Sequence, residues 1–445
     1  MKQQERLLLI GLAIGVSLML IMRDVFGVSV SKYMYLVYVI ALMAVAKYET
    51  MIYMVCFILP LVCGLPGTYM MPCVLLMLFI KKNKLRAWQV VMVLFVVIAE
   101  VFSSLWYQTV YYTKIVQYVS FAGVMLFLSH DESELDYLMC VRMYMLGIVV
   151  LCSTIMTTAI MTAPSDWTDM FAEGEFRFGS TQKDALDGMK LVLNANSLAY
   201  YSITGISCGV LLAEKTKKGE RLFFIACVLI TAIAGMLTVS RTWLIVVGIG
   251  VILYILSKVK YPRRFLIALA AVVLVIYGTL WLLGEATAIV EAFTNRLNFE
   301  NMDSAGGRTE IFQRYMELFW QNTRVMFLGT GVTQYSEVLG ERKAMHNGLQ
   351  QILVCYGVLG CVVMIVALIK PIANACAGRQ RDITTYIPLV GITLFVQSIQ
   401  FLSPHMLMLP YAIGIYALKC APKKKTAQQA PSLEEHEALR GRMMR

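Results

Sequence analysis

The chain has 445 residues, of which 59% are hydrophobic and only 15% are charged, with a formal net charge of +11 and a mean hydropathy of +0.68. Soluble domains carry roughly 25% charged residues, so this composition excludes a soluble fold of comparable length. The basic residues are scattered between apolar runs and form no aromatic-interleaved stripe, so we expect no nucleic-acid partner. The sequence therefore predicts an integral membrane protein, in which a basic surplus sets the orientation.

The apolar runs predict an all-α, polytopic transmembrane helix bundle. A spanning helix needs roughly 20 mostly apolar residues. Candidate spans lie at 7–22, 33–47, 51–66, 68–80, 87–106, 110–129, 139–163, 191–213, 222–239, 242–257, 265–283, 347–370, 385–401 and 404–418. The short pairs 51–66/68–80 and 385–401/404–418 are joined by Pro/Gly turns that could instead mark re-entrant hairpins, so we expect about 14 spans, with a range of roughly 12–14.

The ends of this domain are also predicted from the sequence. No small-residue cleavage site follows the run 7–22, so we expect it to remain as a spanning helix. Residues 1–420 then form one transmembrane domain. Residues 421–445 are polar and low in aromatics, and we expect a disordered tail.

The Lys/Arg clusters predict which side each connection faces. With the N-terminus in the cytoplasm, alternate connections should be rich in Lys and Arg. The basic clusters that fall on the cytoplasmic side are 81–86, 215–218, 258–264, 379–381 and the tail from Lys423. Both termini are then cytoplasmic, and two long external loops remain, at about 164–190 and 284–346.

Few charged residues fall inside the predicted spans. Glu100, Lys114 and Arg142 lie near span ends, where snorkelling of the charged group to the interface explains them. A secondary transporter more often places charges or broken helices near the midplane of several spans, and that pattern is weak here.

The sequence shows no metal or cofactor motif. Neither external loop contains a cysteine, and no disulfide framework or CxxC pair is present. Asp166 and Asp169 flank Trp167-Thr168, and without further ligands they are interpreted as solvated loop acids. We therefore expect neither a bound metal nor a cofactor.

Three positions on the predicted outer side carry candidate chemistry. Arg241, in Ser240-Arg241-Thr242, precedes a span. Its alternative, purely structural role is to anchor the helix at the membrane interface. Arg308 follows Gly306-Gly307 and opens a predicted amphipathic helix. Because a helix N-terminus favours anions, this position is a candidate anion site. The alternative to an anion site is a loop that leads into a helix lying on the bilayer surface. His346 precedes the span 347–370 and could be simply solvated.

The predicted helix after Arg308 has two distinct faces. Apolar residues recur at helical spacing on one face, and polar residues take the other. The apolar set is Ile311, Phe312, Tyr315, Met316 and Phe319, and the polar set is Gln313, Arg314, Glu317 and Gln321.

The three positions are more informative together than separately. Guanidinium groups stay charged at every working pH and match phosphate oxygens with forked donors. Neutral imidazole is a common general base for a hydroxyl proton. Two arginines and a histidine facing outward therefore suit the attack of a hydroxyl on a lipid-linked diphosphate.

Three sequence segments resemble the O-antigen ligase/polymerase family. Residues 238–242 read Thr-Val-Ser-Arg-Thr and look like the family's S-R-[TS] helix start. Residues 307–312 with 327–331 look like its G-R-x-x-x-W/F … G-x-G loop. Residues 344–360 look like its H-N-x-x-L-x-x-L-x-x-x-G-x-x-G block. The resemblance covers roughly residues 190–365.

The resemblance implies a metal-independent, inverting GT-C glycosyltransferase that acts on undecaprenyl-diphosphate-linked glycans in the bacterial cytoplasmic membrane. Arg241 and Arg308 would bind the diphosphate, and His346 would be catalytic. Asn196, in a helix start that is also similar to the family's, and Asn347 and Glu310, within the matching blocks, would support them.

The expected reaction is polymerisation, in which a glycan moves from the undecaprenyl diphosphate donor to a hydroxyl of a lipid-linked acceptor unit. A ligase that transfers the glycan to lipid A core or to a protein uses the same leaving group and stays open. A non-enzymatic flippase for lipid-linked oligosaccharides is a third alternative, although it needs no base. Flippase and chain-length regulator proteins are further expected partners.

Overall fold

The computed structural model describes residues 3–82, 85–108, 111–131, 133, 135–163, 165, 167–173, 177–179, 191, 193–257, 308–340, 345–380, 382–402 and 408–423. Within these ranges the chain forms seventeen α-helices and one 3-10 helix, and no strand. The all-α prediction is therefore confirmed. The predicted span 265–283, the glycines at 306 and 307, and the tail from 424 onward lie outside the described residues.

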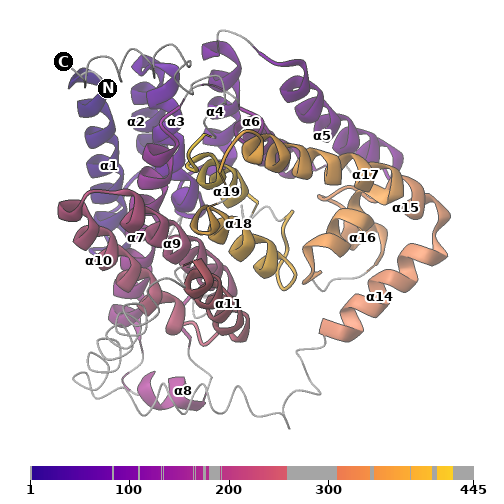
Figure 1. Cartoon of the computed structure of the whole chain (residues 1–445). Helices are drawn as coiled ribbons and strands as arrows, with labels where there is room; N and C mark the ends of the chain where they lie inside the picture. Colours follow the sequence, from indigo (N-terminus) through magenta and orange to yellow (C-terminus); the bar gives the residue numbers. More distant parts are fainter. Residues whose placement is uncertain are drawn as a thin grey trace, which may run out of the picture.

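The first group of helices runs from the N-terminus to the first long loop. Its members are α1 (Gln3–Asp24), α2 (Lys32–Val45), α3 (Tyr48–Ile58), η1 (Leu59–Gly64), α4 (Gly67–Lys81), α5 (Ala87–Trp106), α6 (Tyr112–Ser129) and α7 (Tyr137–Thr162). α1–α4 stand together on one side of the molecule, whereas α5 lies on the other side, beside α17 (Figure 1).

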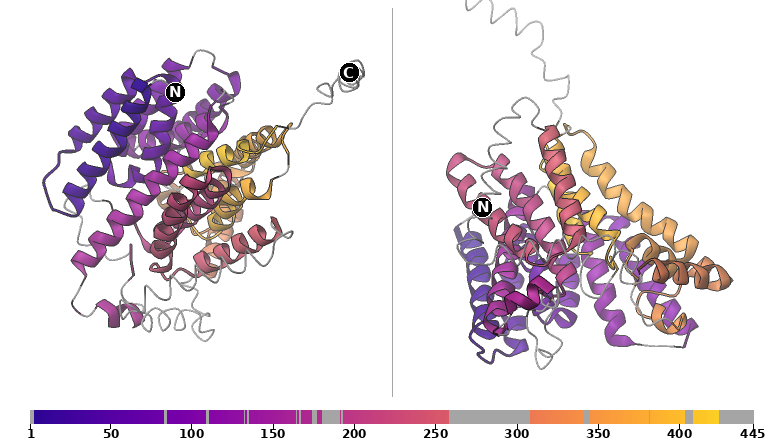
Figure 2. Two further views of the ribbon diagram at one scale, coloured as in Figure 1. Left: turned by 60° about the vertical axis from the view of Figure 1, so that its left-hand side comes forward. Right: turned by 90° about the horizontal axis from the view of Figure 1, so that it is seen from below.

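The second group contains the helices that follow. Its members are α8 (Trp167–Glu173), α9 (Ala195–Lys215), α10 (Lys218–Met236), α11 (Arg241–Ser257), α14 (Arg308–Gln321), α15 (Thr323–Leu328), α16 (Tyr335–Val338), α17 (Gly348–Cys376), α18 (Ile383–Val396) and α19 (Pro410–Lys419). α9 packs against α7 and α10, and α11 packs against α9 and α18; Figure 2 shows these helices from two further sides.

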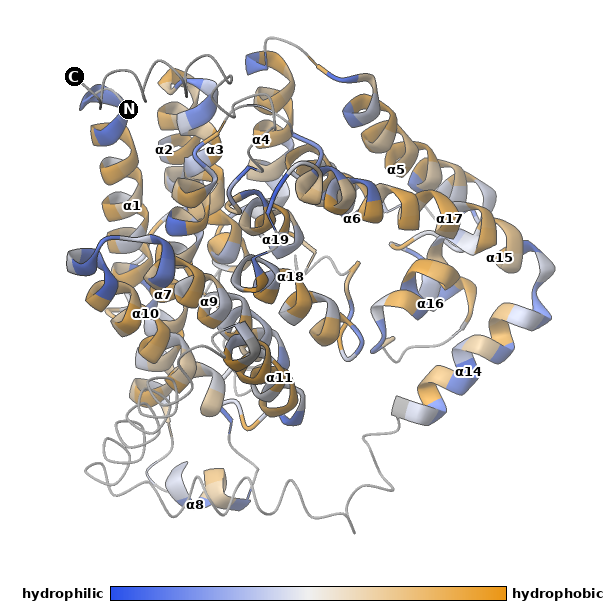
Figure 3. Ribbon diagram, viewed as in Figure 1, coloured by the Kyte–Doolittle hydropathy of each residue, from blue (hydrophilic) through white to orange (hydrophobic). Residues whose placement is uncertain are grey.

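Several helices are long and apolar enough to cross a membrane, so the chain is a multi-pass membrane protein. In the described ranges these are Gln3–Asp24, Ala87–Trp106, Tyr137–Thr162, Lys218–Met236 and Gly348–Cys376. Shorter apolar helices accompany them at Lys32–Val45, Tyr48–Gly64, Gly67–Lys81, Arg241–Ile255 and Ile383–Val396. Apolar residues dominate the helix bodies in Figure 3. The total of about 14 spans stays a prediction.

The basic connections that the sequence places on one side meet at one end of the bundle, called the basic end below. Charged contacts join them: Lys82 with Asp131, Lys215 with Asp382, Lys419 with the backbone carbonyl of Asp131, and Arg379 with the backbone carbonyl of Ala421. These contacts agree with a shared side for four of the predicted cytoplasmic connections. The basic cluster 258–264 lies outside the described residues.

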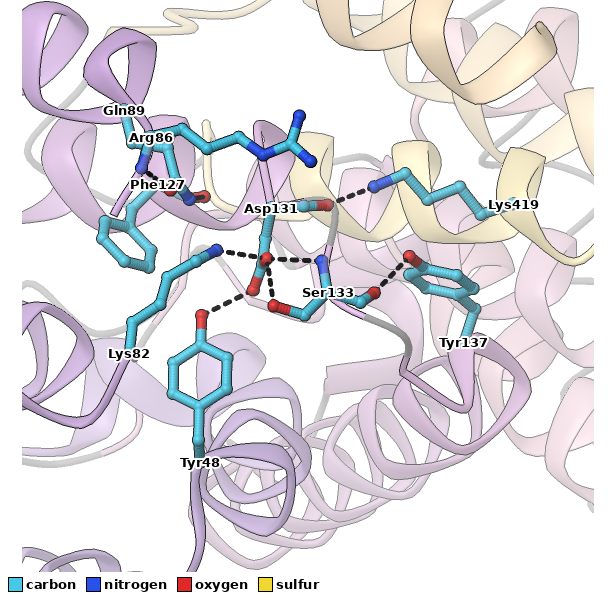
Figure 4. Close-up of polar contacts among 9 residues, drawn as sticks. All are labelled: Tyr48, Lys82, Arg86, Gln89, Phe127, Asp131, Ser133, Tyr137 and Lys419. Carbon is cyan, nitrogen blue, oxygen red and sulfur yellow. Dashed lines mark hydrogen bonds and ion pairs between the residues drawn. The ribbon is translucent and has the colours of Figure 1, made fainter. Parts of the chain in front are cut away.

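Asp131 is the centre of the basic end (Figure 4). Its carboxylate has no exposed surface and accepts hydrogen bonds from Lys82 Nζ at 2.5 Å and from the Tyr48 hydroxyl at 2.5 Å. The backbone N–H and hydroxyl of Ser133 add two more, at 2.9 and 2.7 Å. Burial raises the pKa of Asp131, but the hydrogen bond and charge of Lys82 outweigh it, so the pKa lies below its ordinary value.

His130, beside Asp131, is held in its neutral form. Its Nε2 lies 2.9 Å from the carbonyl oxygen of Ala367 and 3.2 Å from Trp88 Nε1. Burial is the largest cause that lowers the pKa of His130, from 6.5 to about 4, and the charges of Lys370 and Lys419 act in the same direction. This histidine is therefore uncharged at neutral pH.

The opposite end of the bundle, called the outer end below, is closed by a second ion pair. Arg23 binds the Asp24 carboxylate through Nε and Nη2, at 2.7 and 2.8 Å, and its Nη1 donates to the Gly64 carbonyl at 2.7 Å. Asp24 also accepts the backbone N–H of Leu191 at 3.2 Å. The pair joins the end of α1, the η1–α4 turn and the segment that leads into α9.

Candidate functional site

Arg241 is the first residue of α11, at the outer end. The Ser240 side chain caps this helix by accepting the backbone N–H of Trp243 at 3.4 Å. The residue before it, Val239, has φ +47, which is unfavourable for a β-branched side chain. Arg241 is half-buried, and its Nε is buried without a hydrogen-bond partner among the described residues. This nitrogen therefore has an unused hydrogen-bond donor among the described residues.

The turn that carries Arg241 is fixed to its neighbours by a short chain of hydrogen bonds. Trp243 Nε1 donates to the Ser202 hydroxyl at 2.9 Å, and Ser202 donates to the Thr231 carbonyl at 2.6 Å. A Cβ on Gly235 would stand 2.1 Å from both Trp243 Nε1 and Ser202 Oγ, so only glycine fits there. The α9–α10–α11 contact therefore determines where Arg241 lies.

A small apolar cluster covers this turn. Trp167 and Phe171 of α8 form edge-on ring contacts with Phe178, at 5.8 and 6.1 Å between ring centres. Phe178 packs in the same cluster as Leu237 and Val239, and its backbone N–H donates to the Leu237 carbonyl at 3.3 Å. The predicted external loop 164–190 thus contributes a cover for the α10–α11 turn. Asp166 lies outside the described residues.

Arg308 begins α14, as predicted, although the position of its side chain is not among the described features. The amphipathic prediction is largely confirmed, because Ile311, Tyr315 and Phe319 are buried. Phe312, which the periodicity assigns to the same face, is 43% exposed. Its backbone carbonyl accepts a hydrogen bond from α17 instead, and this bond orients α14.

His346 and Asn347 lie immediately before α17. Asn347 is its N-cap, and its side-chain oxygen accepts the backbone N–H of Gln350 at 3.0 Å. His346 is half-buried. Of the residues expected to support the site, Asn347 thus has a structural role, while Glu310 is exposed in the first turn of α14 and Asn196 is half-buried in the first turn of α9.

Two glutamines connect the start of α17 to neighbouring segments. Gln350 Nε2 donates to the Phe312 carbonyl at 2.7 Å, which ties the helix after His346 to the helix that begins at Arg308. Gln351 pairs with the backbone of Leu402 in both directions, at 2.8 and 3.4 Å. The structure therefore joins the helix that begins at Arg308 directly to the helix that follows His346.

The loop 329–334, between α15 and α16, enters the bundle beside a break in α17. Gly357 interrupts that helix with φ +63 and ψ −177. The carbonyls of Val354 and Cys355 then accept the N–H groups of Thr330 and Gly331, at 3.1 and 2.8 Å. Irregular backbone at membrane depth requires such internal partners.

Glycines allow the two backbones to approach each other. A Cβ on Gly329 would stand 2.2 Å from the Cys355 carbonyl oxygen, and a Cβ on Gly357 would stand 2.4 Å from the Phe327 carbonyl carbon. These are the glycines of the G-x-G and G-x-x-G segments in the sequence. Their spacing is explained by this close contact.

Glu100 corrects the sequence interpretation. Instead of snorkelling at a helix end, it has no exposed surface and binds the loop 329–334 from α5. One carboxylate oxygen accepts the Val332 N–H at 2.8 Å, and the other accepts the Thr333 N–H at 3.3 Å and the Thr333 hydroxyl at 3.0 Å. Lys114, by contrast, is exposed at the start of α6 as expected.

Further α5 side chains hold the same loop. Tyr107 donates to the Gly329 carbonyl at 3.2 Å, and Ser104 accepts from the Gln334 side chain. Glu100, Ser104 and Tyr107 are spaced to lie on one face of an otherwise lipid-facing helix. That polar stripe was the signal in the sequence that could have revealed this contact.

The described residues contain no group of three or more His, Cys, Asp or Glu side chains able to hold a metal ion. All eleven cysteines are free thiols, and several, such as Cys140 and Cys208, are fully buried. Metal independence of the reaction stays a prediction.

The model of the O-antigen ligase family matches residues 226–365. Over this segment the chain is similar to the O-antigen ligase family. It contains Arg241, Arg308 and His346 as well as the loop 329–334 and the break at Gly357, so the resemblance inferred from the three motifs is confirmed. No curated protein matches the chain. The family segment identifies an O-antigen ligase or polymerase type of membrane protein, whose members are glycosyltransferase-like enzymes.

Proposed function

We propose that the protein polymerises polysaccharide by transferring a glycan from undecaprenyl diphosphate to a hydroxyl of a lipid-linked acceptor unit, at the outer face of the bacterial cytoplasmic membrane. The observation that carries the proposal is Arg241, at the start of α11 and inside the family segment, whose buried Nε has no hydrogen-bond partner among the described residues. A leaving diphosphate supplies the negative charge and the acceptor oxygens that this group needs.

In the proposed reaction the acceptor hydroxyl attacks the anomeric carbon as the bond from that carbon to the diphosphate breaks with inversion. The diphosphate leaves with the bonding electron pair, and Arg241 and Arg308 neutralise it. His346 accepts the proton of the attacking hydroxyl. Gln350 supports this assignment, because its bond to Phe312 joins the helix that starts at Arg308 to the helix that follows His346.

The test uses purified protein in proteoliposomes with extracted lipid-linked repeat units, and the products are separated on a gel. A ladder of products is expected for a polymerase. A single shifted acceptor would instead indicate a ligase, and lipid translocation without a covalent product would indicate a flippase. His346→Ala should lower transfer by about 100-fold or more, while donor binding persists.

Arg241→Gln should also abolish most transfer. Arg142→Gln is the matched control. In the part of the chain that the structure describes, Arg142 Nε is also buried without a partner, but Arg142 lies at the basic end, where its Nη2 pairs with Glu220 at 2.7 Å. Wild-type turnover in Arg241→Gln, or an equal loss in both variants, would contradict the diphosphate site.

A further inference from the structure

The loop 329–334 lies between the two halves of the proposed site in the sequence. It follows α14 and α15, which begin at Arg308, and it precedes α16 and the segment that leads to His346. A shift of this loop therefore changes the path of the chain on both sides. The contacts that hold the loop therefore help to fix the position of the segment before His346 relative to the helix that begins at Arg308.

Two elements hold the loop, and one of them does so with a carboxyl group. The broken α17 offers backbone carbonyls to Thr330 and Gly331, whereas α5 offers the Glu100 carboxylate to Val332 and Thr333. Both carboxyl oxygens act as acceptors. Among the described residues, the donors that bind them are backbone N–H groups and a hydroxyl, all uncharged.

The depth of Glu100 makes this arrangement costly. It lies six residues before the end of α5, or about 9 Å along the helix axis, and neighbouring side chains such as Ile98 and Leu105 are exposed as lipid-facing residues are. An acidic group within a spanning helix costs roughly 2.5–3.5 kcal/mol on insertion scales, so its default interpretation is functional. A neutral side chain would serve if packing alone were needed.

We propose that Glu100 is a positioning residue for glycan transfer: its carboxylate fixes the loop 329–334 against α17 and so sets the position of His346 relative to the Arg308 helix. The inference rests on the function proposed above. α5 lies outside the family segment 226–365, so the sequence motifs of that segment do not contain this residue. Glu100 itself touches no reacting atom.

The test compares Glu100→Gln with Gln89→Leu in full-length protein in proteoliposomes. Gln89 is the matched control, since it is equally buried in α5 and its Nε2 donates to the Phe127 carbonyl at 3.1 Å, away from the loop. Two properties are measured, the hydrogen exchange of the Val332 and Thr333 amides and the kinetics of transfer. Thr333→Val, which removes only the hydroxyl donor, is a milder second variant.

In Glu100→Gln we expect faster exchange at both amides and a kcat about 10- to 100-fold lower, with KM for the donor within about twofold. Thr333→Val should change the amide exchange and kcat in the same direction, by smaller amounts than Glu100→Gln does. In the double variant its effect should not add to that of Glu100→Gln. Gln89→Leu should change neither. Unchanged exchange in Glu100→Gln overturns the inference, and so does faster exchange with a wild-type kcat.

These outcomes separate the two proposals. If wild-type protein shows no transfer, the proposed function fails and the catalytic part of this inference fails with it. The exchange measurement then still decides whether Glu100 holds the loop, because it does not depend on turnover.

Discussion

Asp131 and Glu100 are the acidic residues without exposed surface in the described part of the chain, and the two are held in different ways. Asp131, at the basic end, is paired with Lys82, and its other donors come from Tyr48 and Ser133. Glu100, towards the outer end, is bound by a loop backbone and one hydroxyl. The first carboxylate joins elements that are already packed together. The second holds irregular backbone that lacks secondary structure of its own.

This difference implies that the two ends of the bundle contribute to different properties of the protein. An ion pair buried with hydrogen bonds on every side is strongly destabilising to break, because its partner is left as an unpaired buried charge. A carboxylate that binds a loop controls local geometry, so its loss should change the loop before it changes global stability. The basic end should therefore determine stability, and the loop region should determine turnover.

The largest stability effect is expected from Asp131→Asn. Removing the charge leaves the Lys82 ammonium, whose side chain is 7% exposed, without its counter-ion. Unfolding free energy in detergent should fall by about 3–5 kcal/mol. The control is Glu220→Gln, which breaks the Arg142–Glu220 pair, whose side chains are 31% and 52% exposed, and should cost at most about 1 kcal/mol. Equal unfolding curves for the two variants would show that the buried pair contributes no more to stability than the exposed pair.

Gly357→Ala tests the loop region, where the expected stability effect is smaller. Its φ and ψ fall in a region that only glycine adopts readily, and a Cβ would stand 2.6 Å from the Gly329 backbone N as well as close to Phe327. We expect a loss of about 1–3 kcal/mol in unfolding free energy, together with a larger relative loss of transfer. Gly248→Ala is the control, since no atom lies within 4 Å of a Cβ built there. A variant that loses stability but keeps wild-type kcat would show that the loop does not govern turnover.

The parts of the fold that follow local rules could be predicted from the sequence. Apolar runs indicated the helices, and the Lys/Arg clusters indicated the connections that meet at the basic end. Arg241, Arg308 and His346 could be proposed as site residues because each stands in a local motif beside a helix start, and their roles stay predictions. Phe312 was assigned to the wrong face, because the hydrogen bond from Gln350 to its carbonyl sets the rotation of α14.

The polar stripe of α5 indicates that this helix has a polar partner, but the identity of that partner could not be predicted, because the two are far apart in the chain. Glu100 and Val332 are separated by 232 positions, and nothing local to either residue indicates the other. The break at Gly357 was also hidden, because hydropathy is continuous through the predicted span 347–370 and a single glycine is tolerated in a helix. Only the approach of Gly329 shows why that position requires one.

The smallest expected effect concerns the pH dependence of stability at the basic end, to which His130 contributes. His130 has a folded-state pKa of about 4 against an ordinary 6.5, so the unfolded chain binds the proton first as the pH falls. The stability that depends on its neutral form is complete above pH 6.5 and is lost progressively between 6.5 and 4. Between pH 7.5 and 5 this amounts to about 2 kcal/mol at most. Asp131, whose pKa is also lowered, adds a loss in the same direction at lower pH.

His130→Gln should therefore show a smaller drop in Tm between pH 7.5 and 5 than wild type, even if its Tm at pH 7.5 is lower. The variant retains Asp131, which stays ionised across this range because its pKa is lowered from an ordinary 3.8, so the difference between the two drops reports His130. His436→Gln, in the polar tail, should keep the wild-type drop. If His130→Gln kept it too, the acid sensitivity would have to come from carboxylates, and the neutral histidine would have no part in stabilising the basic end.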